Sequence, residues 1–199
     1  MSKVLSAMSV SVDGYITGRD PGPGNGLGDG ARLFDWYFDG EVPSREFKSF
    51  KLSAPSARVF DAAASRVGAT IAGRTTYEDS GRFGDDGAPH PSAPLFVLSH
   101  RPAPDMSGGR QTLITTGLAD AVAAAREAAG DKDVVLMGGG VVTEALKAGL
   151  VDEFVLHQIP VLLGAGRPYF QELPEHIQLR LVEAVPAPGV THLHYEVVR

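Results

Sequence analysis

The chain has 199 residues, of which 43% are apolar and 21% charged, the composition of an ordinary folded protein of one domain. Its formal net charge is −6 and no run of Lys or Arg is longer than two, so nucleic acid is not an expected partner. The lack of cysteine excludes disulfides, thiolate nucleophiles and cysteine-based metal sites.

The first predicted element is a strand over residues 4–12, which stops at Asp13-Gly14. The segment PGPGNGLGDG (21–30) holds five glycines and two prolines, which predicts a long flexible loop. A lid over a binding site and a disordered surface insertion both fit that composition. The aromatic-rich segment ARLFDWYFD (31–39) predicts a short helix that either lines a pocket or belongs to the core.

Helices and strands alternate through the middle of the chain. One helix opens at Pro55-Ser56, carries apolar residues as far as Val67 and is ended by Gly68; a second covers residues 118–129 and is ended by Gly130. Strands are predicted at residues 69–73, 94–99 and 134–137. This alternation is typical of parallel strands joined by crossover helices.

The last part of the chain is rich in strands. A strand containing Pro160 is predicted over residues 153–164, and strands 179–185 and 191–198, joined by PAPG, predict an antiparallel hairpin. His192 and His194 fall on one face of the last strand, where a metal pair is conceivable but an ordinary surface strand is the simpler interpretation.

Three glycines, Gly138, Gly139 and Gly140, separate a strand from a helix in VLMGGGVVTEAL. Such a turn brings backbone N–H groups and the positive end of a helix to one point, which suits phosphate. The dinucleotide fingerprint is incomplete, because its third glycine would fall at Thr143, and no Walker lysine is present. A phosphate site and a tight turn without a ligand therefore both remain open.

Two further strand ends carry groups that suit phosphate. IAGRTTYE repeats the order strand, glycine and helix start, with Arg74 at the turn and Thr75 or Thr76 as a helix cap. VLSHRP places a hydroxyl, an imidazole and a guanidinium together, at Ser99, His100 and Arg101. Three such strand ends favour a ligand with more than one phosphate.

Five motifs in register resemble the dihydrofolate reductase-like family, above all its branch with the reductase domain of bacterial riboflavin biosynthesis. They are SVDGYITG, IAGRTTYE, LSHRP, LMGGGVVTEAL and VLLGAGRPYF. The resemblance spans residues 4–198. It implies an α/β fold of three layers (α/β/α), with a mixed, mostly parallel central sheet and a C-terminal antiparallel hairpin. The whole chain, 1–199, is then a single domain.

The same resemblance implies that NADPH binds across the strand ends. It assigns to the pyrophosphate the residues Gly138, Gly139, Gly140, Val141, Thr143, Gly73, Arg74 and Thr75. It assigns Ser99, His100 and Arg101 to the 2′-phosphate, and Ala7, Ile16 and Gly18 to the nicotinamide. The glycine-rich loop becomes a lid candidate over the nicotinamide.

The expected activity is NADPH-dependent hydride transfer to a C=N or C=O bond of a small planar heterocycle of pterin or pyrimidine type. Asp35, on the short helix, is the first candidate for the proton donor and Asp13 the second. A nucleotide- or ligand-binding protein of the same fold without turnover is the alternative. No metal is expected.

The resemblance also implies a possible homodimer. No segment approaches the roughly 18 apolar residues of a membrane span. The N-terminus lacks the apolar core of a signal peptide, so the cytoplasm is the expected location and no membrane partner is expected.

Overall fold

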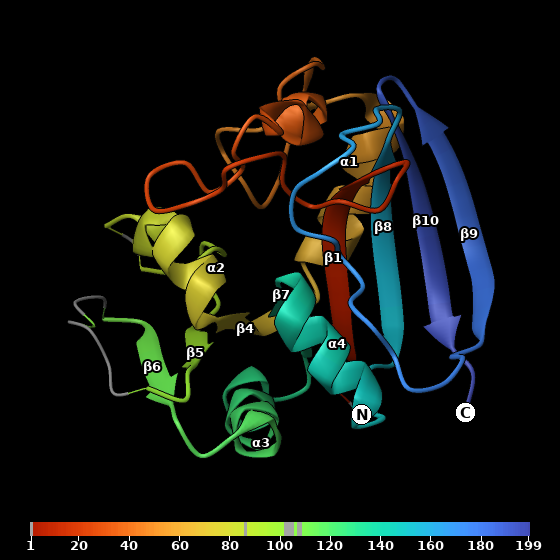
Figure 1. The fold of residues 1–199 in the computed structure, drawn as a ribbon. Helices are drawn as coiled ribbons and strands as arrows, with labels where there is room; N and C mark the ends of the chain where they lie inside the picture. The colour runs from red at the N-terminus through yellow and green to blue at the C-terminus, as the bar shows by residue number, and fades with distance from the viewer. Residues whose placement is uncertain (1, 86, 102–105, 107–108) are drawn as a thin grey trace.

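The computed structural model describes residues 2–85, 87–101, 106 and 109–199; Pro102, the last residue of the motif LSHRP, lies outside them. Its centre is an eight-stranded sheet in the order β6-β5-β4-β7-β1-β8-β10-β9, with β6 at one edge and β9 at the other (Figure 1). The eight strands are β1 (Val4–Ser11), β4 (Val67–Gly73), β5 (Leu95–Leu98), β6 (Gln111–Ile114), β7 (Asp133–Met137), β8 (Glu153–Ile159), β9 (Leu179–Ala187) and β10 (Val190–Val197). A separate two-stranded sheet pairs β2 (Val42–Pro43) with β3 (Lys51–Leu52).

The strands from β6 to β8 run parallel, and β10 pairs antiparallel with both β8 and β9. Parallel neighbours need crossover connections, which the helices supply. The helices are α1 (Ala54–Ala64), α2 (Arg74–Asp79), α3 (Leu118–Ala129) and α4 (Gly139–Lys147), with short 3-10 helices η1 (Ala31–Tyr37) and η2 (Gly81–Phe83). The mixed, mostly parallel sheet with its C-terminal hairpin confirms the predicted fold.

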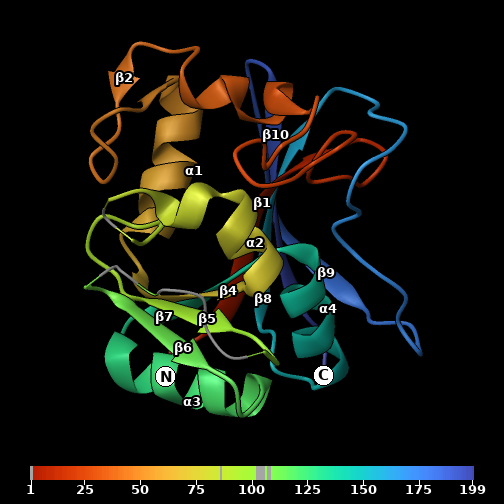
Figure 2. The same ribbon diagram turned by 60° about the vertical axis from the view of Figure 1, so that its left-hand side comes forward.

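Both faces of the sheet are covered. Val134 and Leu136 of β7 pack into the core cluster that holds the buried sides of α3 and α4, whereas Val135 between them points into another cluster. On the far side, α1 and η1 pack together over the end of β8 (Figures 1 and 2). Strands buried on both faces read as continuous apolar runs, which explains VVLM. Within the described ranges no helix has the length and apolarity to cross a bilayer.

Helix α1 ends at Ala64, three residues before the predicted end at Val67. Ser53 caps its start by accepting a hydrogen bond from the Ser56 N–H. Gly68, expected to end the helix, lies inside β4, where an added Cβ would sit 2.7 Å from the Cβ atoms of Ala129 and Lys132. This glycine therefore lets the end of α3 approach the sheet, which is why reading it as a helix stop was wrong.

The glycine-rich loop (21–30) has a compact conformation with backbone hydrogen bonds of its own. The N–H of Gly18, three residues before the loop, donates to the Leu27 carbonyl within it (2.8 Å), and Gly22 and Asn25 bond each other. An added Cβ at Gly28 would lie 1.9 Å from the Arg19 carbonyl oxygen. The glycines allow the chain to pack closely against itself.

The amino-terminal ends of the parallel strands carry a cluster of ion pairs. Glu153, at the start of β8, has a side chain only 3% exposed and contacts Lys3, Arg66 (3.1 Å) and His194 (3.3 Å). Arg66 also pairs with Asp133 at 2.6 Å. Burial disfavours ionisation of Glu153, but Lys3 and Arg66 outweigh it and hold its pKa below the usual range.

His192 belongs to a different environment from His194. Its Nδ1 lies 2.8 Å from Nδ1 of His157, and its Nε2 lies 3.0 Å from the Ser56 hydroxyl. The indole ring of Trp36 packs against both imidazoles, with centroids 4.7 and 5.1 Å away. Burial lowers the pKa of His157 to about 3 and that of His192 to about 4, so both rings are neutral. The two histidines of β10 thus have separate partners and do not face a common point.

Candidate active site

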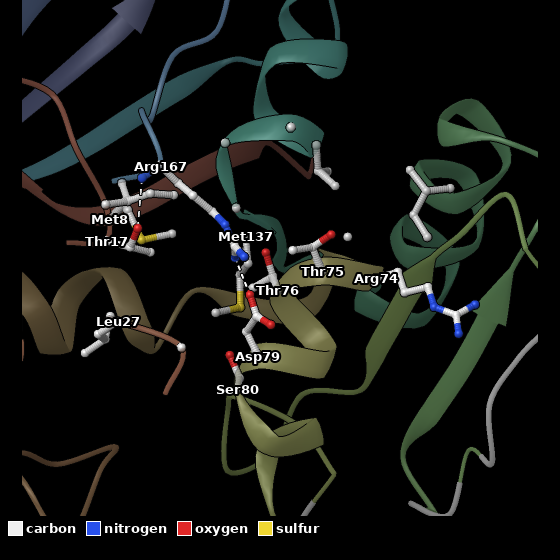
Figure 3. A pocket seen from close by; sticks show the side chains of 18 of the residues that line it. Met8, Thr17, Leu27, Arg74, Thr75, Thr76, Asp79, Ser80, Met137 and Arg167 are labelled. Carbon is white, nitrogen blue, oxygen red and sulfur yellow. Dashed lines mark hydrogen bonds and ion pairs between the residues drawn. The ribbon is translucent and has the colours of Figure 1, made fainter. Parts of the chain in front are cut away.

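A cavity of about 1090 Å³ lies at the carboxyl ends of β1, β4 and β7, bordered by the starts of α2 and α4 (Figure 3). Ligands of open α/β sheets bind at this edge. The glycine-rich loop forms part of its wall through Gly24, Gly26 and Leu27, and Phe34 of η1 adds an aromatic side chain. The predicted lid segment is therefore a wall of the cavity, and one aromatic residue of the short helix lines it.

The three glycines after β7 have different roles. Gly138 has φ +93°, and an added Cβ would lie 2.2 Å from the Thr76 hydroxyl oxygen. An added Cβ at Gly139 would lie 2.6 Å from the Pro168 carbonyl oxygen, whereas at Gly140 the nearest atom is 3.9 Å away, in Gln171. The protein's own packing thus requires the first two glycines, and only Gly140 leaves open space.

Helix α4 begins at Gly139, two residues before the expected start at Val141. Its first intrahelical bond runs from the Val142 N–H to the Gly138 carbonyl, and no side chain caps its N-terminus. The N–H groups of the first turn have no intrahelical acceptor, and residues 138–141 line the cavity. Uncapped donors at the start of a nine-residue helix fit a pyrophosphate.

The start of α2 forms the opposite side of the cavity. Gly73 is the N-cap residue, so Thr75 and Thr76 both lie inside the helix and the prediction that one of them caps it was wrong. The Arg74 guanidinium bonds Glu78 at 2.7 Å and reaches the Ser99 hydroxyl at 3.5 Å. This arrangement brings the second and third predicted strand ends together.

Most predicted cofactor residues meet at this cavity: Ile16, Gly73, Arg74, Thr75, His100, Gly138, Gly139, Gly140 and Val141 line it. The others lie behind or beside it. Ser99 is buried and bonds the backbone of Arg101 through its hydroxyl, and Thr143 is buried and accepts a bond from the Gln171 N–H. Ala7 packs into a core cluster with Met137, and Gly18 lies against Asp29 and Gly30.

Neither predicted catalytic carboxylate is among the residues that line the cavity. Asp13 accepts hydrogen bonds from the Ser11 hydroxyl (2.5 Å) and from the N–H groups of Leu163 and Gly164 (3.1 and 2.7 Å). The Ser11 hydroxyl, followed by these N–H groups, holds the pKa of Asp13 below its usual value, which suits a loop anchor more than a proton donor. Asp35 has a side chain 68% exposed and lies 3.9 Å from Arg32.

Three charged residues that the sequence interpretation did not select line the cavity, namely Asp79, Glu144 and Arg167. Asp79, at the end of α2, forms an ion pair with Arg167, from the segment after β8. Arg167 belongs to the recognised motif VLLGAGRPYF, where it follows Gly166, whereas Asp79 lies one residue beyond the motif IAGRTTYE. Only the fold shows that the two meet.

Comparison with known proteins identifies the family and supports the fold. The family model of the RibD C-terminal domain matches residues 2–193. The chain belongs to this family. Among curated relatives, the uncharacterized protein YwjB of Bacillus subtilis is 29% identical over 129 residues, covering 65% of this chain and 73% of YwjB. The uncharacterized protein YyaP of the same organism is 44% identical over 66 residues, 32% of this chain and 35% of YyaP.

Solved structures support the same fold. A putative riboflavin biosynthesis protein from Shewanella sp. PV-4 superposes with a TM-score of 0.72 at 26% identity, covering all of both chains. RibD of Acinetobacter baumannii gives 0.65 at 15% identity, with all of this chain and 59% of that one covered. Dihydrofolate reductase of Enterococcus faecalis, complexed with NADP(H), gives 0.61 at 16% identity over 99% and 97% of the chains. The RibD C-terminal domain of this chain thus has a reductase-type fold.

Proposed function

We propose that this RibD C-terminal domain protein is an NADPH-dependent reductase of a small planar molecule. The observation that carries the proposal is the course of the cavity, which runs from the uncapped start of α4 to apolar side chains of β1, of the following loop and of η1, namely Met8, Ile16 and Phe34. The start of α4 suits phosphate groups, and the apolar end suits planar rings.

NADPH would supply the hydride, and the chain's own residues would bind and orient the reactants. The N–H groups at residues 139–141 would hold the pyrophosphate. Arg74 and His100 would face the 2′-phosphate, with Ser99 fixed behind them by its bonds to the Arg101 backbone. Apolar side chains at the far end would exclude water from the two rings.

The test is a titration with NADPH and, separately, NADH, followed by cofactor fluorescence and thermal stability. We expect saturable binding of NADPH and weaker binding of NADH. Arg74→Met should weaken binding of NADPH about tenfold and leave NADH nearly unchanged, because one charge-assisted contact to phosphate is lost. Absence of binding of both cofactors would refute the proposal.

A binding protein without turnover is the second candidate. It is favoured by the position of Asp13 and Asp35, both outside the cavity lining, which leaves the reaction without either expected proton donor. Oxidation of NADPH in the presence of pterin, pyrimidine or carbonyl compounds would decide for the reductase. Tight binding without oxidation by any of them would decide for the binding protein.

A homodimer in the cytoplasm remains part of the proposal. Strand β9 is an edge of the sheet and exposes Leu181 and Val182. Apolar side chains on an unpaired edge invite pairing with another chain. Sedimentation equilibrium would show whether two copies associate.

A further inference from the structure

Two arginines line the cavity, and each is paired with a carboxylate of α2. Arg74 pairs with Glu78 at 2.7 Å, and Arg167, from the segment after β8, pairs with Asp79. The proposed function places Arg74 at the 2′-phosphate although it is paired in this way. A carboxylate partner is therefore no obstacle to phosphate binding by Arg167, whose position in the cavity has still to be explained.

Arg167 lies beside the start of α4. An added Cβ at Gly139 would lie 2.6 Å from the carbonyl oxygen of Pro168, the residue that follows Arg167. Thr76 of α2 approaches Gly138 equally closely, and Figure 3 shows the Arg167 guanidinium beside Thr76. The guanidinium thus lies in the part of the cavity where the N–H groups at the start of α4 have no intrahelical acceptor.

The two members of the ion pair differ in exposure. The Asp79 side chain is 8% exposed and the Arg167 side chain 37%, so a ligand in the cavity would meet mainly the guanidinium. A guanidinium has five N–H donors. Its hydrogen bonds within the described part of the chain go to Asp79 and to the Pro21 carbonyl (3.4 Å), which leaves donors for a ligand.

Arg167 is also held in position before any ligand binds. Its backbone N–H donates to the Thr17 hydroxyl at 2.9 Å, while Asp79 and the Pro21 carbonyl hold the guanidinium. A side chain that is already fixed loses little conformational entropy when it contacts a ligand. Guanidinium groups form strong, paired hydrogen bonds with phosphate oxygens. The arrangement is therefore that of a preorganised phosphate donor.

We propose that Arg167 binds the pyrophosphate of the cofactor together with the N–H groups at the start of α4, and that Asp79 holds the guanidinium while its own charge weakens the contact. The inference rests on the proposed function, since it needs a dinucleotide in the cavity. It divides the phosphates between two arginines, with Arg74 at the 2′-phosphate and Arg167 at the pyrophosphate. Arg167 binds the cofactor and carries no chemical step.

The first test compares the full-length natural protein with Arg167→Met for binding of NADPH, NADH and ADP-ribose. All three ligands contain the pyrophosphate, but NADH lacks the 2′-phosphate and ADP-ribose lacks the nicotinamide as well. Cofactor fluorescence gives the Kd of NADPH and NADH, and displacement of NADPH gives that of ADP-ribose. We expect about tenfold weaker binding of all three, because each loses one charge-assisted contact. Arg74→Met should instead weaken NADPH alone.

The second test uses Asp79→Asn to distinguish contact with the ligand from a purely structural role of the ion pair. Arg167→Met and Asp79→Asn both disrupt the pair, so a structural role predicts weaker binding in both variants. Contact with the pyrophosphate predicts opposite effects, because Asp79→Asn removes a nearby negative charge and keeps an acceptor oxygen for the guanidinium. We expect Asp79→Asn to bind all three ligands severalfold more tightly.

The matched controls come from a second ion pair. Arg58 and Glu183 lie 3.0 Å apart on the surface, and neither is among the described residues that line the cavity. Arg58→Met and Glu183→Gln change the net charge of the protein as Arg167→Met and Asp79→Asn do. Both controls should leave the three affinities unchanged, which separates a local contact from the effect of overall charge.

Unchanged affinity in a folded variant of either Arg167 or Asp79, a loss in both variants, or a loss confined to NADPH would each overturn the inference. A loss for NADPH and NADH without a loss for ADP-ribose would also overturn it, since the guanidinium would then act at the nicotinamide. If one variant does not fold, the other decides alone. Absence of NADPH binding to the natural protein would instead count against the proposed function, so the two failures are distinguishable.

Discussion

The two ends of the parallel strands differ in how their polar groups are satisfied. At the amino-terminal ends, Glu153, Lys3, Arg66 and Asp133 satisfy one another in a cluster of ion pairs. At the carboxyl-terminal ends, the helix start after Gly138 has uncapped N–H groups that face a cavity. One edge of the sheet is complete without a ligand, and the other has donors that a ligand can use.

This difference teaches that charge alone does not mark a site in this fold. A cluster of linked ion pairs lies at the edge opposite the cavity, where the charged partners are already matched. The candidate site is marked instead by backbone geometry, above all by the φ of +93° at Gly138. Substitutions at the amino-terminal edge should therefore lower stability without changing ligand affinity, whereas substitutions at the start of α4 should lower ligand affinity.

The largest effect is expected from Glu153→Gln. The change removes the buried carboxylate that Lys3 and Arg66 share and leaves Arg66 with Asp133 alone, and breaking a buried pair in this way costs about 3 kcal/mol of the free energy of unfolding. Urea unfolding would measure the loss. Affinity for NADPH should not change, and a parallel loss of affinity would mean that the two edges are not independent.

The second largest effect is expected from Gly138→Ala. A side chain at φ +93° that also meets the Thr76 hydroxyl should cost about 2 kcal/mol of stability, and affinity for NADPH should fall because the start of α4 is displaced. Thermal unfolding and cofactor titration of the same protein would show both losses. A variant as stable as the natural protein would contradict the turn geometry.

The third prediction concerns the pH dependence of stability, which the buried pair His157 and His192 should determine. Because burial holds the pKa values of His157 and His192 at about 3 and about 4, below the usual value of about 6.5, the unfolded chain binds protons first as the pH falls. Stability is therefore complete above about pH 6.5 and declines toward pH 4, by about 1 kcal/mol per pH unit for each ring.

The measurement is the free energy of unfolding between pH 7 and pH 4, two values that span this titration window. The double variant His157→Phe with His192→Leu should show a shallower decline than the natural protein. His176→Gln, which changes an exposed histidine, is the control and should keep the natural slope. Equal slopes in all three proteins would show that the buried pair does not determine the pH dependence.

The smallest effect on stability is expected from Gly140→Ala. Its added Cβ meets nothing closer than 3.9 Å, and alanine in the first turn of α4 should raise the free energy of unfolding by about 0.5 kcal/mol. Affinity for NADPH should nevertheless fall, since this is the glycine whose open space faces the proposed pyrophosphate. Unchanged affinity would place the pyrophosphate elsewhere.

Much of the fold was predictable because local signals and tertiary packing agree. Helix α3 has the predicted bounds, with Gly130 at φ +60° directly after it, and the C-terminal hairpin follows the predicted strands closely. Gly68 misled the prediction because a glycine that ends a helix and a glycine that admits a neighbouring helix look alike in sequence. Only the contact with Ala129 distinguishes them.

The candidate site was predictable where glycines determine the backbone, and less so for the carboxylates. Asp35 lies on a 3-10 helix, whose three residues per turn align positions i and i+3. Leu33 and Trp36 therefore share the buried side, while Arg32 and Asp35 share an exposed one. Asp79 and Arg167 are 88 residues apart, and no local pattern joins them.

The backbone hydrogen bonds of the glycine-rich loop also have a thermodynamic consequence for any ligand of the cavity. Immobilising a flexible segment costs about 1–2 kcal/mol per residue, and in proteins with disordered lids this cost subtracts from affinity. Here Gly18 bonds Leu27, and Gly22 and Asn25 bond each other, without any contact to a ligand. These bonds favour one conformation of the wall before a ligand binds, which reduces the entropy that ligand contacts with the ten-residue loop must offset.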